Sequence, residues 1–288
     1  MTPALRARLL ELAADPRTVD QIGNDPVRFV HRYPDPADQE IAGFFASALA
    51  FGRVSLFAPV IAAVLDRADA LGGPSTWART LDADAEHAAL DGLYYRWTRA
   101  SDLVVLAAAL GDVQRSHGSL GALVRVGPDE PDVVPALSRL VLAVREAVVR
   151  HTGVPFDSAP RGLRYLLVDP AEGSSAKRVH LYARWMVRSD AVDRGVWSHV
   201  PPRSLLVPVD THVHRIARLV GLTDRKAADL RTSREVTARL RALDAEDPVR
   251  FDFALAHVGI SGGCRGQHVP AVCDACALQS LCSEGSAG

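Results

Sequence analysis

Residues 208–221 read Pro-Val-Asp-Thr-His-Val-His-Arg-Ile-Ala-Arg-Leu-Val-Gly, the pattern of a helix with a defined start. Asp210 follows a proline and precedes a helical run, and aspartate is a favoured residue at the N-cap of a helix. Strand alternation is scarce in the chain, whereas apolar residues recur at three- and four-residue steps in residues 40–70, 103–110, 134–149 and 179–187. The sequence therefore predicts an all-α protein of about ten helices or more.

The composition is that of a folded chain without a membrane span. The 288 residues are 48% hydrophobic and 23% charged, which is enough apolar material for two compact units or one large unit. The longest apolar runs cover about eight residues, against the roughly 20 that a transmembrane helix needs. The first twelve residues carry Arg6 and Arg8 and lack the apolar block of a secretory signal. We expect a monomeric cytoplasmic protein that does not associate with membranes.

Charge is unevenly distributed along the chain. The net charge of −1 argues against a protein that coats nucleic acid with its whole surface. Between Arg161 and Lys226, however, there are twelve basic residues and six acidic ones. This local surplus suits a nucleoid-associated protein that grips a polyanion on one face, with an ordinary solvated surface as the alternative. Only Lys177 and Lys226 are lysines among the 33 basic residues, and arginine cannot replace a lysine that acts as an amine nucleophile.

All four cysteines lie within 19 residues, at Cys264, Cys273, Cys276 and Cys282. In a cytoplasmic protein such crowding indicates a metal centre rather than two disulfides. Zinc sites are commonly built from two separated C-x2-C pairs, whereas here one such pair is flanked by single cysteines. The spacing favours a [4Fe–4S] cluster held by these four residues, with zinc as the alternative.

Three segments together resemble the C-terminal half of endonuclease III and related iron–sulfur-containing helix-hairpin-helix DNA glycosylases. They are the cysteine tail, Phe251-Asp-Phe-Ala-Leu255 and Pro208 to Gly221, and the resemblance covers residues from about 160 to 283. The first cysteine gap has eight residues where the family usually has six. The N-terminal half resembles only a bacterial branch of this superfamily, and the segment from Arg188 to Pro202 is similar to the long insert of its archaeal 8-oxoguanine glycosylases.

The resemblance implies an all-α, two-lobed helix-hairpin-helix glycosylase fold with a C-terminal iron–sulfur cluster loop. The implied central domain covers residues 21–205 and carries the hairpin at about 165–188. The second lobe then combines residues 1–20 with residues 206–288, including the cluster loop at 264–282. Aligning the family's hairpin lysine with Lys177 places Gly173 on the first hairpin glycine, but Glu172 on a proline and Ser175 on the second glycine. Because hairpin glycines let backbone N–H groups approach a DNA phosphate, Ser175 weakens this contact and Glu172 adds an unfavourable negative charge.

The activity implied by the resemblance is that of a DNA base-excision repair glycosylase and AP lyase acting on double-stranded DNA that contains an oxidised base. Lys177 corresponds to the amine that forms a Schiff base with the sugar. Asp210 corresponds to the carboxylate that stabilises the positive charge developing on the sugar. The DNA-binding residues expected from this assignment are Gly173, Ser174, Ser175, Arg178, Arg215 and Arg218.

Each assignment has a simpler structural alternative. Asp210 could serve only as a helix N-cap, and Lys177 could be a solvated residue at a helix start. Two histidines and two tryptophans could contact a ligand, namely His212, His214, Trp185 and Trp197. Their simpler role is packing or hydrogen bonding. At the level of function, the alternatives are a noncatalytic iron–sulfur DNA-binding protein, a monofunctional glycosylase and a zinc-stabilised helical interaction module.

Overall fold

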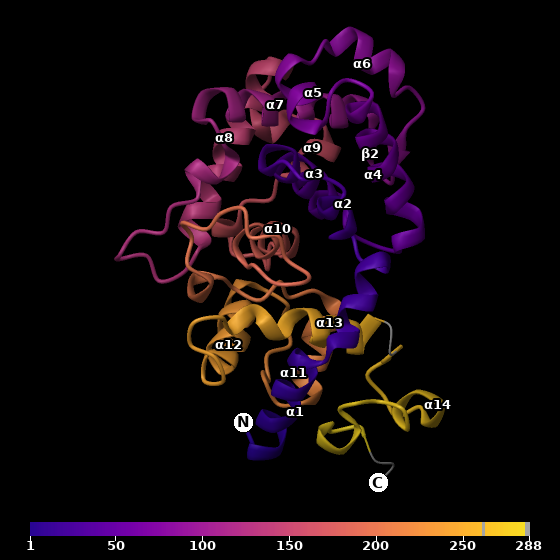
Figure 1. Cartoon of the computed structure of the whole chain (residues 1–288), viewed down its shortest axis with the longest axis vertical. Helices are drawn as coiled ribbons and strands as arrows, with labels where there is room; N and C mark the ends of the chain where they lie inside the picture. The colour runs from indigo at the N-terminus through magenta and orange to yellow at the C-terminus, as the bar shows by residue number, and fades with distance from the viewer. Residues whose placement is uncertain (261–262, 286–288) are drawn as a thin grey trace. The chain divides into compact units, whose positions relative to one another are not determined.

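The computed structural model describes residues 1–260 and 263–285 (Figure 1). The chain is 63% helix and 3% strand, which confirms the all-α class. Contacts divide it into two units: unit 1 comprises Met1–Gln21, Gly173–Arg184 and Pro201–Gly288, and unit 2 comprises Ile22–Glu172 and Trp185–Val200. This division differs from the expected domain boundaries at residues 173–184, which the resemblance assigns to the central domain and which here cluster with unit 1. No helix in the described ranges combines the length and the apolar character needed to cross a bilayer.

Unit 2 is built around its two longest helices, α7 (Ala100–His117) and α8 (Val134–Thr152), which pack against each other (Figure 1). Helix α5 packs on α7, and an added Cβ at Gly111 of α7 would lie 1.9 Å from the carbonyl oxygen of Ala78, so the two helices approach closely only because this position has no side chain. The other elements of this unit are α2 (Arg28–His31), α3 (Pro36–Leu49), α4 (Val54–Asp69), α5 (Pro74–Thr80), α6 (Ala83–Ala89), β1 (Tyr94–Tyr95), β2 (Thr98–Arg99), η2 (Leu120–Leu123), η3 (Phe156–Ser158), α9 (Arg161–Leu166) and η4 (Pro170–Glu172).

A buried carboxylate ties together distant segments of unit 2. Glu40 of α3 is 3% exposed and accepts hydrogen bonds from the backbone N–H groups of Leu120 (2.9 Å) and Gly121 (3.0 Å) and from Trp197 Nε1 (2.7 Å). Several donors compensate the cost of burying its charge. Trp197 and Trp185 are both fully buried, so they belong to the core rather than to an exposed stacking surface.

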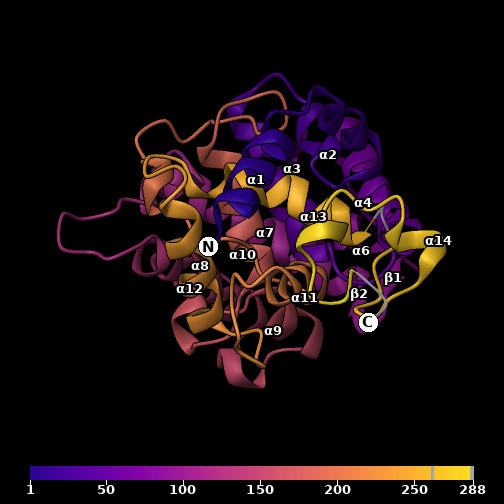
Figure 2. The same cartoon turned by 90° about the horizontal axis from the view of Figure 1, so that it is seen from below.

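Unit 1 packs α11 against α13, and α1 against both α13 and the short η6 turn that precedes it (Figures 1 and 2). Gly259 of α13 permits the first contact, because an added Cβ there would lie 3.1 Å from His212 Cβ of α11. The elements of this unit are α1 (Pro3–Ala14), the start of α10 (Lys177–Val187), η5 (Pro202–Ser204), α11 (Thr211–Leu219), α12 (Leu230–Arg241), η6 (Pro248–Phe251), α13 (Asp252–Ile260), α14 (Pro270–Cys273) and η7 (Gln279–Leu281). The η1 turn (Pro16–Asn24) leads from unit 1 into unit 2, and the chain passes between the units again within α10.

Hydrogen bonds from two helices of unit 1 hold the cysteine-containing loop. Arg8 Nε of α1 donates to the Ala277 carbonyl at 2.7 Å, and the Ser283 N–H donates to the Leu219 carbonyl at the end of α11 at 2.9 Å. Figure 2 shows this loop in yellow, with α14 near its tip. Both anchoring points follow the C-x2-C pair, and they lie on either side of Cys282.

Candidate functional site

Lys177 is the first residue of α10 and follows a tight turn. Within the turn, Gly173 (φ +88°) and Ala176 (φ +38°) both have left-handed backbone conformations. The Ala176 N–H donates to Ser174 Oγ at 3.2 Å, and the Gly173 carbonyl accepts from the Leu230 N–H at 3.1 Å. The turn is therefore fixed both internally and against the start of α12, which determines where Lys177 enters the helix.

Asp210 uses its two carboxylate oxygens differently. It is the N-cap of α11, and its Oδ1 accepts hydrogen bonds from the backbone N–H groups of His212 (2.8 Å) and Val213 (2.9 Å). Its Oδ2 lies 3.8 Å from Lys177 Nζ. The N-cap role expected as an alternative is thus confirmed, and it leaves the second oxygen directed at the lysine. The two side chains are 24% and 23% exposed, so both groups are largely desolvated and still reachable from solvent.

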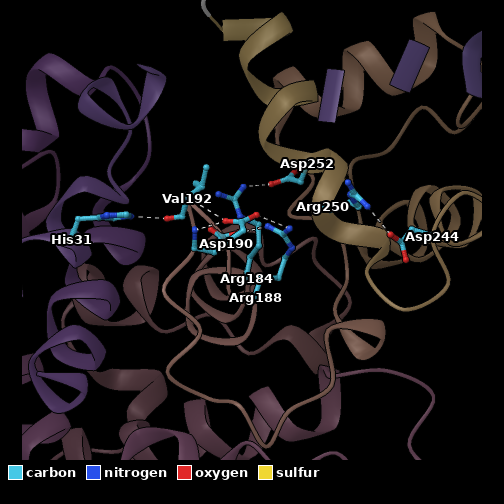
Figure 3. Close-up of polar contacts among 9 residues, drawn as sticks. His31, Arg184, Arg188, Asp190, Val192, Asp244, Arg250 and Asp252 are labelled. Atoms are coloured by element: carbon cyan, nitrogen blue, oxygen red, sulfur yellow. Dashed lines mark hydrogen bonds and ion pairs between the residues drawn. The ribbon is translucent and has the colours of Figure 1, made fainter. Parts of the chain in front are cut away.

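A second ion pair lies two turns further along α10. Arg184 Nη1 donates to Asp252 Oδ2 at 2.5 Å, and the two side chains are 2% and 3% exposed (Figure 3). Asp252 is the first residue of α13, so the pair connects the helix that carries Lys177 to the helix that packs on α11. Burial raises the pKa of the Asp252 carboxyl, and the negative charge of Asp210 acts in the same direction, whereas Arg184 and Lys177 oppose it. Asp252 is therefore within electrostatic reach of both proposed catalytic residues.

Sequence reasoning missed the Arg184–Asp252 pair. The available signal was Asp252 itself, a carboxylate inside the apolar run Phe251-Asp-Phe-Ala-Leu255, because a charged residue in such a run needs a buried partner. The spacing of seven residues from Lys177 to Arg184 also predicts that both side chains lie on the same side of α10. Neither signal identifies the partner, because the sequence separation of 68 residues between Arg184 and Asp252 is bridged only by packing.

The hairpin residues expected to bind DNA differ in exposure. Gly173 and Ser174 are exposed, and Ser175 and Arg178 are half-buried. An added Cβ at Gly173 would meet no atom within 4 Å, so glycine suits this position for its positive φ and not for lack of space. Glu172 has a partner that the sequence did not indicate: its Oε1 accepts from Arg145 Nη1 at 2.8 Å.

Three further polar residues of α11 have local partners. Arg215 Nη2 donates to His212 Nδ1 at 3.1 Å, and His214 Nε2 donates to the Arg225 carbonyl at 2.9 Å. Both histidines therefore form hydrogen bonds, the simpler of the two roles expected for them. Arg218 is exposed at the end of the helix, and it is the α11 arginine best able to meet a phosphate.

The four cysteines converge on one pocket. The pocket is lined by Cys264, Cys273, Cys276 and Cys282 together with apolar side chains of α11, which include Ile216 and Leu219. All four cysteines are free thiols. The Val269 N–H points to Cys273 Sγ at 3.3 Å. Burial raises the pKa of the Cys282 thiol, and the other three cysteines act in the same direction, as expected for four neighbouring sulfurs.

This donor set fits a metal centre of the kind expected from the sequence, since four sulfurs from one loop share an apolar-walled pocket and backbone N–H groups approach the sulfurs. Within the described residues, no three His, Cys, Asp or Glu side chains are arranged closely enough to hold a single metal ion as they stand.

Comparison with known proteins identifies one family. Residues 25–261 match the family described as a protein of unknown function (DUF2400). The matched range includes most of unit 2, the hairpin, Lys177, Asp210 and Asp252, and it ends before the four cysteines. No curated protein and no solved structure matches the chain. Because the match extends over more than half of its length, the chain belongs to the DUF2400 family.

Proposed function

We propose that this protein is a helix-hairpin-helix DNA glycosylase with AP lyase activity, which removes an oxidised base from double-stranded DNA. The observation that carries the proposal is the approach of Lys177 Nζ to Asp210 Oδ2, 3.8 Å apart, between side chains that are each about three-quarters buried. A base-excision lyase needs one amine and one carboxylate in a partly desolvated, accessible position. In a chain with only two lysines, one of them lies in this arrangement.

The two residues would act in sequence on a nucleotide rotated out of the duplex. The C1′–N bond breaks with its electrons going to the departing base, and Asp210 Oδ2 stabilises the positive charge left on the sugar. Lys177 Nζ, after losing its proton, forms a bond to C1′. The C1′–O4′ bond then opens with a proton going to O4′, which yields an iminium ion. Loss of a C2′ proton and cleavage of the C3′–O3′ bond, with the phosphate as leaving group, nick the strand.

The N-cap role of Asp210 supports the electrostatic part of this mechanism. Two backbone N–H groups hold Oδ1, so the carboxylate cannot rotate without losing a helix cap. Oδ2 therefore stays directed at Lys177, and the charge is positioned before substrate binds. Such fixed placement of charge is the main source of electrostatic stabilisation in enzymes.

The cysteine loop would hold a [4Fe–4S] cluster through Cys264, Cys273, Cys276 and Cys282. Such a cluster would supply a rigid centre that folds the loop, with no part in bond breaking. Exposed Arg265, next to the first cysteine, is then available to a DNA phosphate. Purified protein should contain about four iron and four labile sulfide per chain; a stoichiometric zinc content without sulfide would support the zinc alternative instead.

Borohydride trapping tests the activity. Incubation with an oligonucleotide panel of oxidised bases and an abasic site, followed by reduction, should give a covalent protein–DNA complex that is lost in Lys177→Ala and retained in Lys226→Ala. Lys226 is exposed and serves as the matched control. Base release without trapping would indicate a monofunctional glycosylase. DNA binding without base release on every lesion would indicate the noncatalytic alternative.

A further inference from the structure

Unit 2 has a surface hairpin that the proposed chemistry does not use. Strands β1 and β2 pair Tyr94 with Arg99 and Tyr95 with Thr98, and the loop residue Arg96 has φ +55°. Behind the hairpin, four rings form one aromatic cluster. The cluster consists of Phe51, Tyr95, Trp97 and Tyr165. Ring centroids lie 4.7 to 4.8 Å apart in three pairs: Phe51 with Tyr95, Phe51 with Tyr165, and Trp97 with Tyr165.

Guanidinium groups lie on this aromatic cluster. The Arg96 guanidinium is 5.6 Å from the centre of Phe51, and that of Arg161 is 4.7 Å from the centre of Trp97. Stacking on rings restrains an arginine side chain while leaving its N–H groups available to phosphate oxygens. Among the described residues, Arg96 and Arg161 take part in no ion pair.

Further exposed arginines lie within two residues of the rings of this cluster in the sequence. They come from the turn before α4, from β2 and from α9, and they are Arg53, Arg99 and Arg164. Tyr94, at 70%, is the most exposed of the large hydrophobic side chains on the described surface. Tyr94, Arg96 and Arg99 line an open pocket of about 670 Å³, in which Asp91 is the acidic residue. In this pocket, two arginines and an exposed ring lie beside one carboxylate, that of Asp91.

The backbone makes the cluster rigid before any ligand arrives. An added Cβ at Gly52 would lie 2.7 Å from Tyr95 Oη and 2.9 Å from Arg96 Nη2, so the hairpin rests directly on this glycine. An added Cβ at Gly162 would lie 2.2 Å from Asp102 Oδ2, so α9 also approaches the start of α7 at closest range. Arginines from three separate segments are therefore held together by packing, which reduces the entropy lost on binding.

We infer that this surface, defined by Arg53, Arg96, Arg99, Arg161, Arg164 and Tyr94, binds the sugar–phosphate backbone of DNA, with Tyr94 placed to stack on a base. Clustered arginines next to an exposed aromatic ring are the combination that recognises a nucleic-acid strand. The choice of DNA as the polyanion rests on the proposed function, whereas the surface itself includes neither Lys177 nor Asp210 and none of the hairpin residues 173–178.

A salt titration of DNA binding tests the inference. Binding of a fluorescent duplex to the full chain is measured by anisotropy from 50 to 300 mM salt for the unmodified protein and for Arg96→Gln/Arg161→Gln. Loss of two phosphate contacts should lower the slope of log K against log salt by about 1.8 and weaken binding about 50-fold at 0.1 M salt. Because these two arginines stack on rings, Arg53→Gln/Arg99→Gln is measured in parallel, and circular dichroism checks that both variants fold.

Arg79→Gln/Arg125→Gln provides the matched control, since both residues are exposed in unit 2 and the variant loses the same charge. The control should bind like the unmodified protein. Equal affinities and salt slopes for all three variants would overturn the inference while leaving the proposed function intact. Failure of the unmodified protein to bind DNA at any salt concentration would overturn both.

Discussion

On α10, an ammonium–carboxylate pair and a guanidinium–carboxylate pair lie in different environments. Lys177 and Asp210 lie 3.8 Å apart with about a quarter of each side chain exposed, whereas Arg184 and Asp252 lie 2.5 Å apart and are almost completely buried. Water can reach the first pair, and its long separation leaves the amine able to exchange its partner. The second pair is inaccessible, and breaking it would leave a charge in the core. One helix thus carries a pair suited to chemistry and a pair suited to holding the helix in place.

The largest expected effect comes from breaking the buried pair. Asp252→Asn removes the negative charge that pairs with buried Arg184 and should lower the free energy of unfolding by about 3–5 kcal/mol. Urea denaturation followed by circular dichroism measures the change. The double variant Arg184→Met/Asp252→Leu removes both charges and should be more stable than Asp252→Asn. A single variant as stable as the unmodified protein would show that the pair does not hold α10.

Asp210→Asn separates charge from capping in the accessible pair. Asparagine caps a helix as well as aspartate does, so the stability should change little. Loss of the negative charge beside the developing sugar cation should reduce single-turnover base release about 10²- to 10³-fold. The assay uses whichever lesion the oligonucleotide panel identifies. An unchanged rate would remove Asp210 from the reaction and leave it as an N-cap alone.

Asp210→Ala measures the capping contribution that Asp210→Asn leaves in place. Without a side-chain acceptor for the His212 and Val213 N–H groups, α11 should lose about 1 kcal/mol of stability. The difference in unfolding free energy between the alanine and asparagine variants reports the cap. If the two variants are equally stable, the hydrogen bonds at Oδ1 contribute nothing measurable.

The smallest effect is expected at the other lysine. Lys226 is exposed, so Lys226→Gln should change stability by less than about 0.5 kcal/mol and leave borohydride trapping unchanged. The measurement is made beside Lys177→Gln, which should fold normally and lose trapping. Loss of trapping in both variants would point to a general loss of positive charge rather than to one nucleophile.

Parts of the candidate site could be predicted from local patterns. The proline and the helical run around Asp210 predicted an N-cap, and the structure has this cap with two hydrogen bonds. The cysteine spacing predicted a [4Fe–4S] cluster; the four cysteines line one pocket, and the cluster itself stays a prediction. The pairing of Glu172 with Arg145 could not be predicted in this way, because Arg145 is 27 residues away and belongs to α8.

The sequence by itself determined the helical class, the cap at Asp210 and the clustering of the cysteines, since each depends on residues within a few turns of one another. Only the tertiary structure decided how closely Asp210 approaches Lys177, which arginine is buried with Asp252, and that Arg96 and Arg161 stack on one aromatic cluster. Periodicity specifies which side of a helix is apolar, but the partner of a charge is set by how helices pack, and packing depends on the shapes of all the side chains in the core.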